Sequence, residues 1–218
     1  MIKAIIFDMD GVLVDSERIH IAIEKRQFSL NNLPISDEEH QQYMGVSSEI
    51  MWQTIAKLHT LSLSVNELIE QHRIESHRYF SELNEIPVMP GLVDLLENLK
   101  TKGYTLAVAS SSTPEIIDLI LNKTHLKKYF QVMVSAKQAG KSKPEPDVFL
   151  MAAQKLGVSP AHCLVVEDSD NGIKAAIAAQ MMCVAYQGPD ADPKNQTEAN
   201  YVVKSFAQLE LILKSLNS

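Results

Sequence analysis

The amino-acid sequence predicts an α/β fold, a doubly wound parallel sheet interrupted by an inserted α-helical domain. Two observations lead to this prediction. Short apolar runs alternate with helical patterns through most of the chain, as in a parallel sheet whose strands are joined by helices. By contrast, the residues between the first apolar run and Tyr104 show helical spacing without a convincing strand. The simplest arrangement is therefore a helical insertion within an α/β core.

Six apolar runs are expected to form the strands of the sheet. They are short and lack polar alternation, which indicates burial on both faces. The runs are Ile2–Phe7, Tyr104–Ala109, Val132–Val134, Cys163–Val166, Met182–Ala185 and, as an edge strand, Tyr201–Val203.

Helical segments between these runs are expected to cover the two faces of the sheet. Gly103 and Gly157 fit the C-terminal ends of two of them, and Thr113-Pro114 fits the beginning of another. The segments are Leu92–Lys100, Thr113–Asn122, Pro146–Leu156, Asn171–Ala179 and Phe206–Leu216.

The inserted region carries four further helical segments. In the last of them, Leu68, His72 and Phe80 share one apolar stripe at helical spacing. The segments are Glu17–Leu30, Asp37–Met44, Ser48–Leu58 and Val65–Leu83. We therefore expect a discontinuous core of residues 1–15 and 87–218 and a helical cap domain of residues 16–86.

The composition excludes several classes of function. A net charge of -7 and a pI near 5.5 argue against nucleic acid or an anionic membrane as a partner. The first apolar stretch is too short for a signal peptide, and no later run approaches the roughly 18 apolar residues of a membrane span. Cys163 and Cys183 lie in apolar runs and are expected to be buried thiols in a reducing compartment. We expect a cytoplasmic monomer.

Polar side chains stand where four of the expected strands end. Because the C-terminal ends of parallel strands share one edge of the sheet, these side chains should converge in space. They are Asp8 and Asp10 after the first strand, Ser110 to Ser112 after the second, Lys143 in the loop after the third, and Glu167 and Asp168 after the fourth.

This set of residues predicts phosphoryl-transfer chemistry. Crowded carboxylates need a cation among them, and ligation by oxygen alone favours Mg²⁺. Asp8 and Asp10 point the same way in extended backbone, and Gly11 lets the chain turn away. One carboxylate can attack phosphorus while the other moves protons, and a lysine and a serine suit the transferring phosphoryl oxygens.

Four segments, in order, resemble the motifs of the haloacid dehalogenase-like hydrolase superfamily. They are "FDMDGVLVDS", "VASSST", "KSKPEPDVF" and "VVEDSDNGI", and the similarity spans Met1 to about Val184. The nearest branch is that of β-phosphoglucomutase and the sugar-phosphate phosphatases. The resemblance implies a Rossmann-like core with an inserted helical cap, Mg²⁺ as cofactor and a small phosphorylated metabolite as substrate.

The resemblance also assigns roles residue by residue. It implies Asp8 as the nucleophile, Asp10 as the acid and base, and Ser110, together with Ser111, as phosphate ligand. Lys143 would neutralise the phosphoryl charge. The metal would be held by Asp8, Asp10, Asp168 and Glu167, the last directly or through water.

Several of these residues have a purely structural alternative. Ser112-Thr113-Pro114-Glu115 fits a capping box at the beginning of a helix, which would occupy Ser112. Ser169 and Asp170 can cap the helix that follows them. Lys141 is a second lysine in the loop of Lys143, but the residue before Pro144 is the one that matches the family.

Candidate residues in the insertion are fewer. His20, Gly45 and Ser48 are expected to face the substrate, whereas His72, His77, Trp52, Met44 and Met51 are expected to pack within the domain or lie on its surface. Asp15 and Ser16 stand where the chain enters the insertion, as a hinge would.

Three functions compete: a phosphatase acting on a phosphorylated sugar or polyol, a phosphosugar mutase, and a non-catalytic phosphate- or protein-binding module. Intact Asp8, Asp10, Lys143 and Asp168 disfavour the module. Two departures from β-phosphoglucomutase favour hydrolysis over isomerisation. Ser48 stands where that enzyme has a phosphate-binding arginine, and Pro114 stands where it has an asparagine. Arg18, Lys25 and Arg26 are the other cations that could bind a second phosphate.

Overall fold

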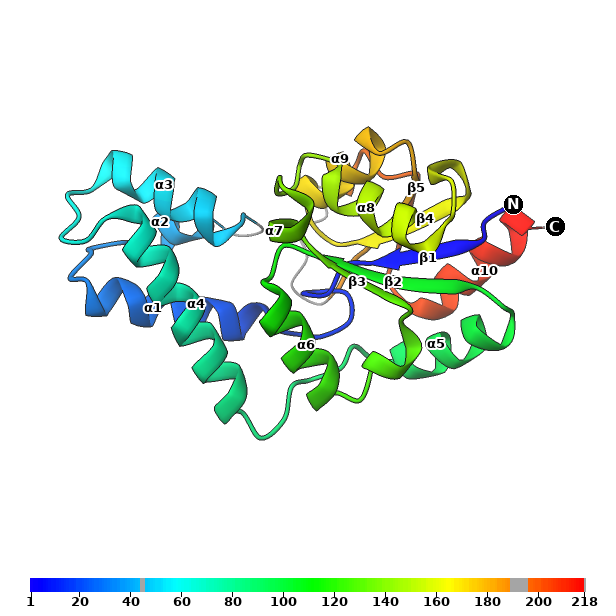
Figure 1. The fold of residues 1–218 in the computed structure, drawn as a ribbon, viewed down its shortest axis with the longest axis horizontal. Coiled ribbons are helices and arrows are strands. Elements are labelled where there is room, and N and C mark those ends of the chain that lie inside the picture. The colour runs from blue at the N-terminus through cyan, green and yellow to red at the C-terminus, as the bar shows by residue number, and fades with distance from the viewer. Residues whose placement is uncertain (44–45, 189–195, 218) are drawn as a thin grey trace. The chain divides into compact units, whose positions relative to one another are not determined.

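The structure of the protein, a computed structural model, describes residues 1–43, 46–188 and 196–217. It divides into two compact units (Figure 1). One unit comprises Met1–Asp15 and Glu85–Ser218, and the other comprises Ser16–Asn84.

The first unit contains a six-stranded sheet in the order β3-β2-β1-β4-β5-β6, in which every neighbouring pair is parallel. The strands are β1 (Ala4–Phe7), β2 (Thr105–Ser110), β3 (Val132–Ser135), β4 (Cys163–Glu167), β5 (Met182–Tyr186) and β6 (Tyr201–Val203). All six coincide with the expected apolar runs to within two residues. The predicted α/β class, with a parallel sheet, is confirmed.

Helices cover both faces of this sheet (Figure 1). On one face lie α7 (Ala136–Ala139), α8 (Asp147–Leu156) and α9 (Asp170–Ala178), and on the other lie α5 (Leu92–Thr101), α6 (Pro114–Lys123) and α10 (Phe206–Asn217). Two short 3-10 turns, η1 (Lys127–Tyr129) and η2 (Pro160–His162), complete the unit. The sequence pattern did not predict α7. Its four residues are too few for a periodic apolar face, and it is defined by a capping box between Ser135 and Gln138.

The core of the first unit explains why the strands carry no polar alternation. All four residues of β1 are buried, and alternate ones face opposite layers. Ala4 and Ile6 pack with Val148 and Phe149 of α8, whereas Phe7 meets Phe130 edge-on at 6.1 Å between ring centroids. A strand buried on both sides cannot hold a polar side chain until it ends. The polar side chains therefore gather at the strand ends.

The second unit is a helical bundle. Its helices are α1 (Glu17–Leu30), α2 (Asp37–Gln41), α3 (Ser48–Leu58) and α4 (Val65–Glu82). Trp52, Met51 and Ile55 of α3 pack with Phe28 of α1 and Leu68 of α4, so the prediction that Trp52 and Met51 are packing residues is confirmed. The second helix ends at Gln41, earlier than expected, and Met44 lies outside the described residues.

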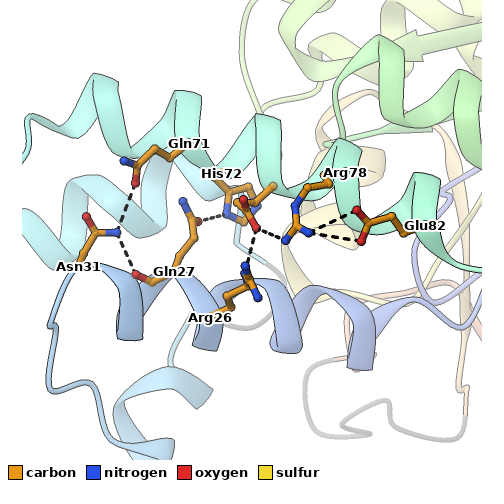
Figure 2. Close-up of polar contacts among 8 residues, drawn as sticks. Arg26, Gln27, Asn31, Gln71, His72, Arg78 and Glu82 are labelled. Carbon is orange, nitrogen blue, oxygen red and sulfur yellow. Dashed lines mark hydrogen bonds and ion pairs between the residues drawn. The ribbon is translucent and has the colours of Figure 1, made fainter.

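Hydrogen bonds between polar side chains link α1 to α4 in this bundle, as Figure 2 shows. Nδ1 of the buried His72 lies 2.8 Å from Oε1 of Gln27, and Asn31 donates to Oε1 of Gln71. Burial lowers the pKa of His72 to about 4, so its imidazole is neutral at pH 7. His72 is therefore a bundle residue, whereas His77 is exposed.

Two further observations concern the chain as a whole. Within the three described segments, no helix combines the length and the apolar character needed to cross a membrane. Cys163 and Cys183 are both buried and free.

Candidate active site

The register of the sheet places Asp8 beside Glu167. Phe7, the last residue of β1, pairs with Val166 of β4 on one side and with Val108 of β2 on the other. Asp8 and Glu167 are the next residues along the two neighbouring strands, and the backbone N–H of Asp8 donates to the carbonyl of Val166 at 2.9 Å. Residues far apart in the sequence thus meet at the C-terminal edge, as expected.

Lys143 lies between these two carboxylates. Its ammonium donates to Oδ1 of Asp8 and to Oε1 of Glu167, each at 2.5 Å. Nζ also lies 5.0 Å from the ring centroid of Phe149, and all three charged side chains are buried. Burial works to lower the pKa of Lys143, but the charges of Asp8 and Glu167 outweigh it and the pKa is raised. Lys143 is therefore an ammonium at neutral pH, whereas Lys141 is exposed and lies 3.8 Å from Glu145.

Asp168 joins this cluster from the residue after β4. Oxygens of Asp8, Glu167 and Asp168 lie within 4.8 Å of one another. When all are ionised, three carboxylates and one ammonium leave two negative charges in a buried site, an imbalance that a divalent cation would neutralise. In keeping with this, burial raises the pKa of Asp8 to about 7, and burial together with the charges of Glu167 and Asp8 raises the pKa of Asp168. An oxygen-only set of this kind fits Mg²⁺.

Glu167 is the most extensively bonded of these carboxylates. Its Oε2 accepts hydrogen bonds from the backbone N–H groups of Asp168 and Ser169 at 2.8 Å, and from the Ser169 hydroxyl at 3.0 Å. The Ser169 hydroxyl in turn accepts from the N–H of Gly172 and so caps α9, as predicted. Gly172 has room only for hydrogen, because a Cβ there would lie 1.8 Å from Oε1 of Glu167.

The absence of a side chain at Gly11 likewise leaves space for the carboxylate of Asp168. Gly11 has a φ of +78°, and a Cβ on it would lie 2.0 Å from Oδ2 of Asp168. The predicted turn at Gly11 is therefore present, and its lack of a side chain also lets the Asp168 carboxylate approach the end of β1.

Asp10 accepts a hydrogen bond from Ser112, one of the three serines expected at this edge, for which helix capping was the structural alternative. The Ser112 hydroxyl donates to Oδ2 of Asp10 at 3.1 Å, and the backbone N–H of Ser112 donates to Oγ of the buried Ser110 at 3.0 Å. The proposed capping box was wrong. Thr113 is the N-cap of α6 with Pro114 as the first helical residue, but among the described residues its hydroxyl has no hydrogen-bond partner.

Two other residues near this edge are placed as follows. Ser111 follows Ser110 but is exposed. Gln196, a residue to which no role was assigned from the sequence, is buried, and its amide donates to the carbonyls of Asp168 at 2.8 Å and Tyr186 at 3.1 Å. No local sequence pattern predicts the burial of Gln196, because its hydrogen-bond partners lie at the ends of β4 and β5.

The candidate residues of the helical unit are placed as follows. The ring of His20 meets Phe80 edge-on at 5.3 Å between centroids, within the bundle. Ser48 is the first residue of α3, directly after the N-cap Ser47, and is half-buried. Gly45 lies outside the described residues.

Clustered carboxylates and a buried lysine at the carboxyl edge of a parallel sheet, with a helical unit inserted after the first strand, define the haloacid dehalogenase-like class of α/β hydrolases. The chain belongs to the haloacid dehalogenase-like hydrolase family, whose model matches residues 5–186. The predicted family and the predicted class of enzyme, a haloacid dehalogenase-like phosphatase, are confirmed.

Named relatives fall on both sides of the phosphatase and mutase alternatives. The chain is 33% identical to a phosphorylated carbohydrates phosphatase of Thermotoga maritima, covering 81% of each chain. It is 31% identical to a β-phosphoglucomutase of Bacillus subtilis, over 84% of this chain and 82% of that one. The crystal structure of a β-phosphoglucomutase from Clostridium difficile matches with a TM-score of 0.86 and 27% identity, over 100% of this chain and 98% of that chain.

Proposed function

We propose that this protein is a Mg²⁺-dependent phosphatase that hydrolyses a small phosphorylated sugar or polyol through a phosphoryl group carried on Asp8. The observation that supports this best is the buried ammonium of Lys143, at 2.5 Å from Asp8. An ammonium so close to a carboxylate nucleophile lies where the oxygens of an arriving phosphoryl group would need positive charge. The named relatives support a phosphorylated sugar as the class of substrate.

The reaction has two steps. In the first, a carboxylate oxygen of Asp8 attacks phosphorus, the bond from phosphorus to the ester oxygen breaks, and the leaving alkoxide takes a proton from Asp10. In the second, Asp10 takes a proton from water, whose oxygen attacks phosphorus and releases inorganic phosphate from Asp8. Lys143 and the Ser110 hydroxyl stabilise the phosphoryl oxygens in both steps.

The metal would be held by Asp8, Asp168 and Glu167, whose carboxylate oxygens lie within 4.8 Å of one another. Asp10 was also expected as a ligand, but its side chain is assigned to proton transfer, and a carboxylate bound to the metal could not carry the proton. A bound Mg²⁺ would supply charge that neutralises the phosphate and the surrounding carboxylates. Glu167 already accepts four hydrogen bonds, from Lys143, Asp168 and Ser169. Its main contribution is therefore to hold Lys143 in place.

Hydrolysis rather than isomerisation is favoured by the cations of the helical unit. A mutase must hold a bisphosphate, which needs a cation far from the metal. Ser48 is uncharged, and two of the alternative cations are already in ion pairs, Lys25 with Asp37 at 2.6 Å and Arg26 with Glu75 at 3.1 Å. The Glu75 carboxylate also accepts from Arg78 at 2.8 Å. Arg78 in turn bonds Glu82 (Figure 2). Lys25 and Arg26 are therefore already paired within the helical unit.

The mutase is the second candidate, because a named relative is a β-phosphoglucomutase. Incubation with β-glucose 1-phosphate and a bisphosphate primer separates the two functions. We expect phosphorus NMR to show inorganic phosphate rather than glucose 6-phosphate. Isomerisation that outpaces phosphate release would make the enzyme a mutase.

The proposed function itself is tested by phosphate release from a panel of phosphorylated sugars and polyols, with Mg²⁺ and with a chelator. Release that needs Mg²⁺ and is lost in Asp8→Asn would support it. A folded wild-type protein that binds phosphate but releases none from any substrate would favour the non-catalytic module. We further propose that Ser16–Asn84 acts as a cap with its hinge at Asp15 and Ser16, and that the enzyme is cytoplasmic.

A further inference from the structure

Ser112 has a hydroxyl that the helix beside it does not use. It precedes Thr113, the N-cap of α6, and its Oγ donates to Oδ2 of Asp10 at 3.1 Å. The two residues are 102 positions apart, so this bond depends on the fold and not on a local turn. Helix capping, the structural alternative for Ser112, does not account for this bond.

The position of Ser112 is itself fixed from the sheet. Its backbone N–H donates to Oγ of Ser110 at 3.0 Å, and Ser110 is fully buried at the end of β2, paired with Ser135 of β3. Beyond Ser112, Pro114 begins α6. Ser112 thus lies between the buried end of β2 and the beginning of α6, and both limit the movement of its hydroxyl.

We propose that Ser112 is a positioning residue for proton transfer, which holds Oδ2 of Asp10 and so fixes the orientation in which this carboxyl group meets the leaving group. This inference rests on the proposed function, in which Asp10 gives a proton to the leaving alkoxide. A carboxylate rotates about its terminal bond, and a donor on one oxygen selects one orientation. Proton transfer needs heavy atoms within about 3 Å, so a freely rotating carboxylate is a poorer donor.

The hydrogen bond predicts a selective defect. Ser112→Ala should reduce kcat about tenfold or more toward an alkyl phosphate, whose leaving group must be protonated. The same variant should lose less than about threefold toward p-nitrophenyl phosphate, whose leaving group needs little protonation. Ser112→Thr keeps the hydroxyl and should restore the alkyl phosphate rate, whereas Ser112→Val, of similar shape, should not.

The same comparison in an Asp10→Asn background shows whether Ser112 acts through Asp10. If it does, Ser112→Ala should cause no further loss there, because the two residues act as a unit. A urea unfolding curve for each variant shows that the fold is retained, and the Thr and Val pair keeps the test valid if Ala disturbs the loop.

The outcomes distinguish the role of Ser112 from the proposed phosphatase function. Equal losses on both substrates would make Ser112 a phosphate ligand, and an unchanged alkyl phosphate rate would remove it from the reaction; either result in an active enzyme overturns this role alone. A loss that persists in the Asp10→Asn background would do the same. Absence of phosphate release by the wild-type protein would overturn the proposed function and this role together.

Discussion

The substitution Gly172→Ala is a test in which two physical effects predict opposite changes in the free energy of unfolding. Gly172 lies in the first turn of α9, where replacing glycine by alanine ordinarily stabilises a helix by about 0.5–1 kcal/mol. Here an added Cβ would lie 1.8 Å from Oε1, 1.9 Å from Cδ and 2.4 Å from Oε2 of Glu167, whereas ordinary contacts begin at 3.4 Å. Glu167 must therefore move if Gly172→Ala is to fold.

The cost of that movement follows from the bonds of Glu167. Its carboxylate holds Lys143 at 2.5 Å and accepts three hydrogen bonds at the beginning of α9. Overpacking alone costs about 1–3 kcal/mol, and a weakened buried ion pair adds to it. We expect Gly172→Ala to lower the free energy of unfolding by about 3 kcal/mol, and to reduce phosphate release because Lys143 loses one of its two carboxylates.

Urea denaturation measures the first effect and phosphate release the second. Gly188→Ala is the matched control, because its Cβ would meet its nearest neighbours at 3.5 Å or more, and we expect a change within about 0.5 kcal/mol. In a Glu167→Ala background, Gly172→Ala should cost little, since the clash is gone. A Gly172→Ala protein as stable and as active as the wild type would refute the reasoning.

Four further predictions concern single side chains. Asp8→Asn should abolish turnover and leave the fold intact, because an amide is a poor nucleophile; a labelled phosphoenzyme in this variant would contradict the role of Asp8. Asp10→Asn should lose most activity toward alkyl phosphates and less toward p-nitrophenyl phosphate, and a ratio of rates equal to that of the wild type would exclude it as the proton donor. Lys143→Ala should slow the reaction by about a hundredfold or more, as for the loss of one preorganised charge, whereas a change below about threefold would remove it from the site. His72 has a pKa of about 4 in the folded protein and an ordinary value of 6.5. Between these two pH values the unfolded chain binds more protons than the folded protein. The free energy of unfolding therefore falls as the pH is lowered from 6.5 to 4, by about 3 kcal/mol in all. His72→Gln should flatten this dependence in urea titrations at several pH values while exposed His77→Gln should not, and equal slopes in all three proteins would contradict the burial argument.

The strands could be predicted because burial on both faces leaves a signal in the sequence itself. The four groups of polar residues that follow these strands could also be predicted, since a polar residue after a buried strand must lie at the edge of the sheet. The end of the second strand placed Ser112 at this edge, but its bond to Asp10 could not be predicted. The Ser-x-x-Glu pattern that suggested helix capping is local and contains no information on a partner 102 residues away. Gln196 escaped prediction for the same reason, since its bonds to Asp168 and Tyr186 depend on the packing of strand ends.

The position of β1 at the centre of the sheet has a consequence for how the protein acquires activity. Ile6 of β1 pairs with Ala107 and Val165, so both of its neighbours come from much later in the chain, beyond the whole helical insertion. Contacts of such sequence separation form slowly, because a long loop must close before they stabilise anything. Asp8 therefore cannot meet Lys143, which follows β3, or stand beside Glu167 at the end of β4, until these later parts of the sheet have docked. During refolding, phosphate release should return only with the last phase, after the helices have formed, so the enzyme's own turnover reports completion of its long-range topology.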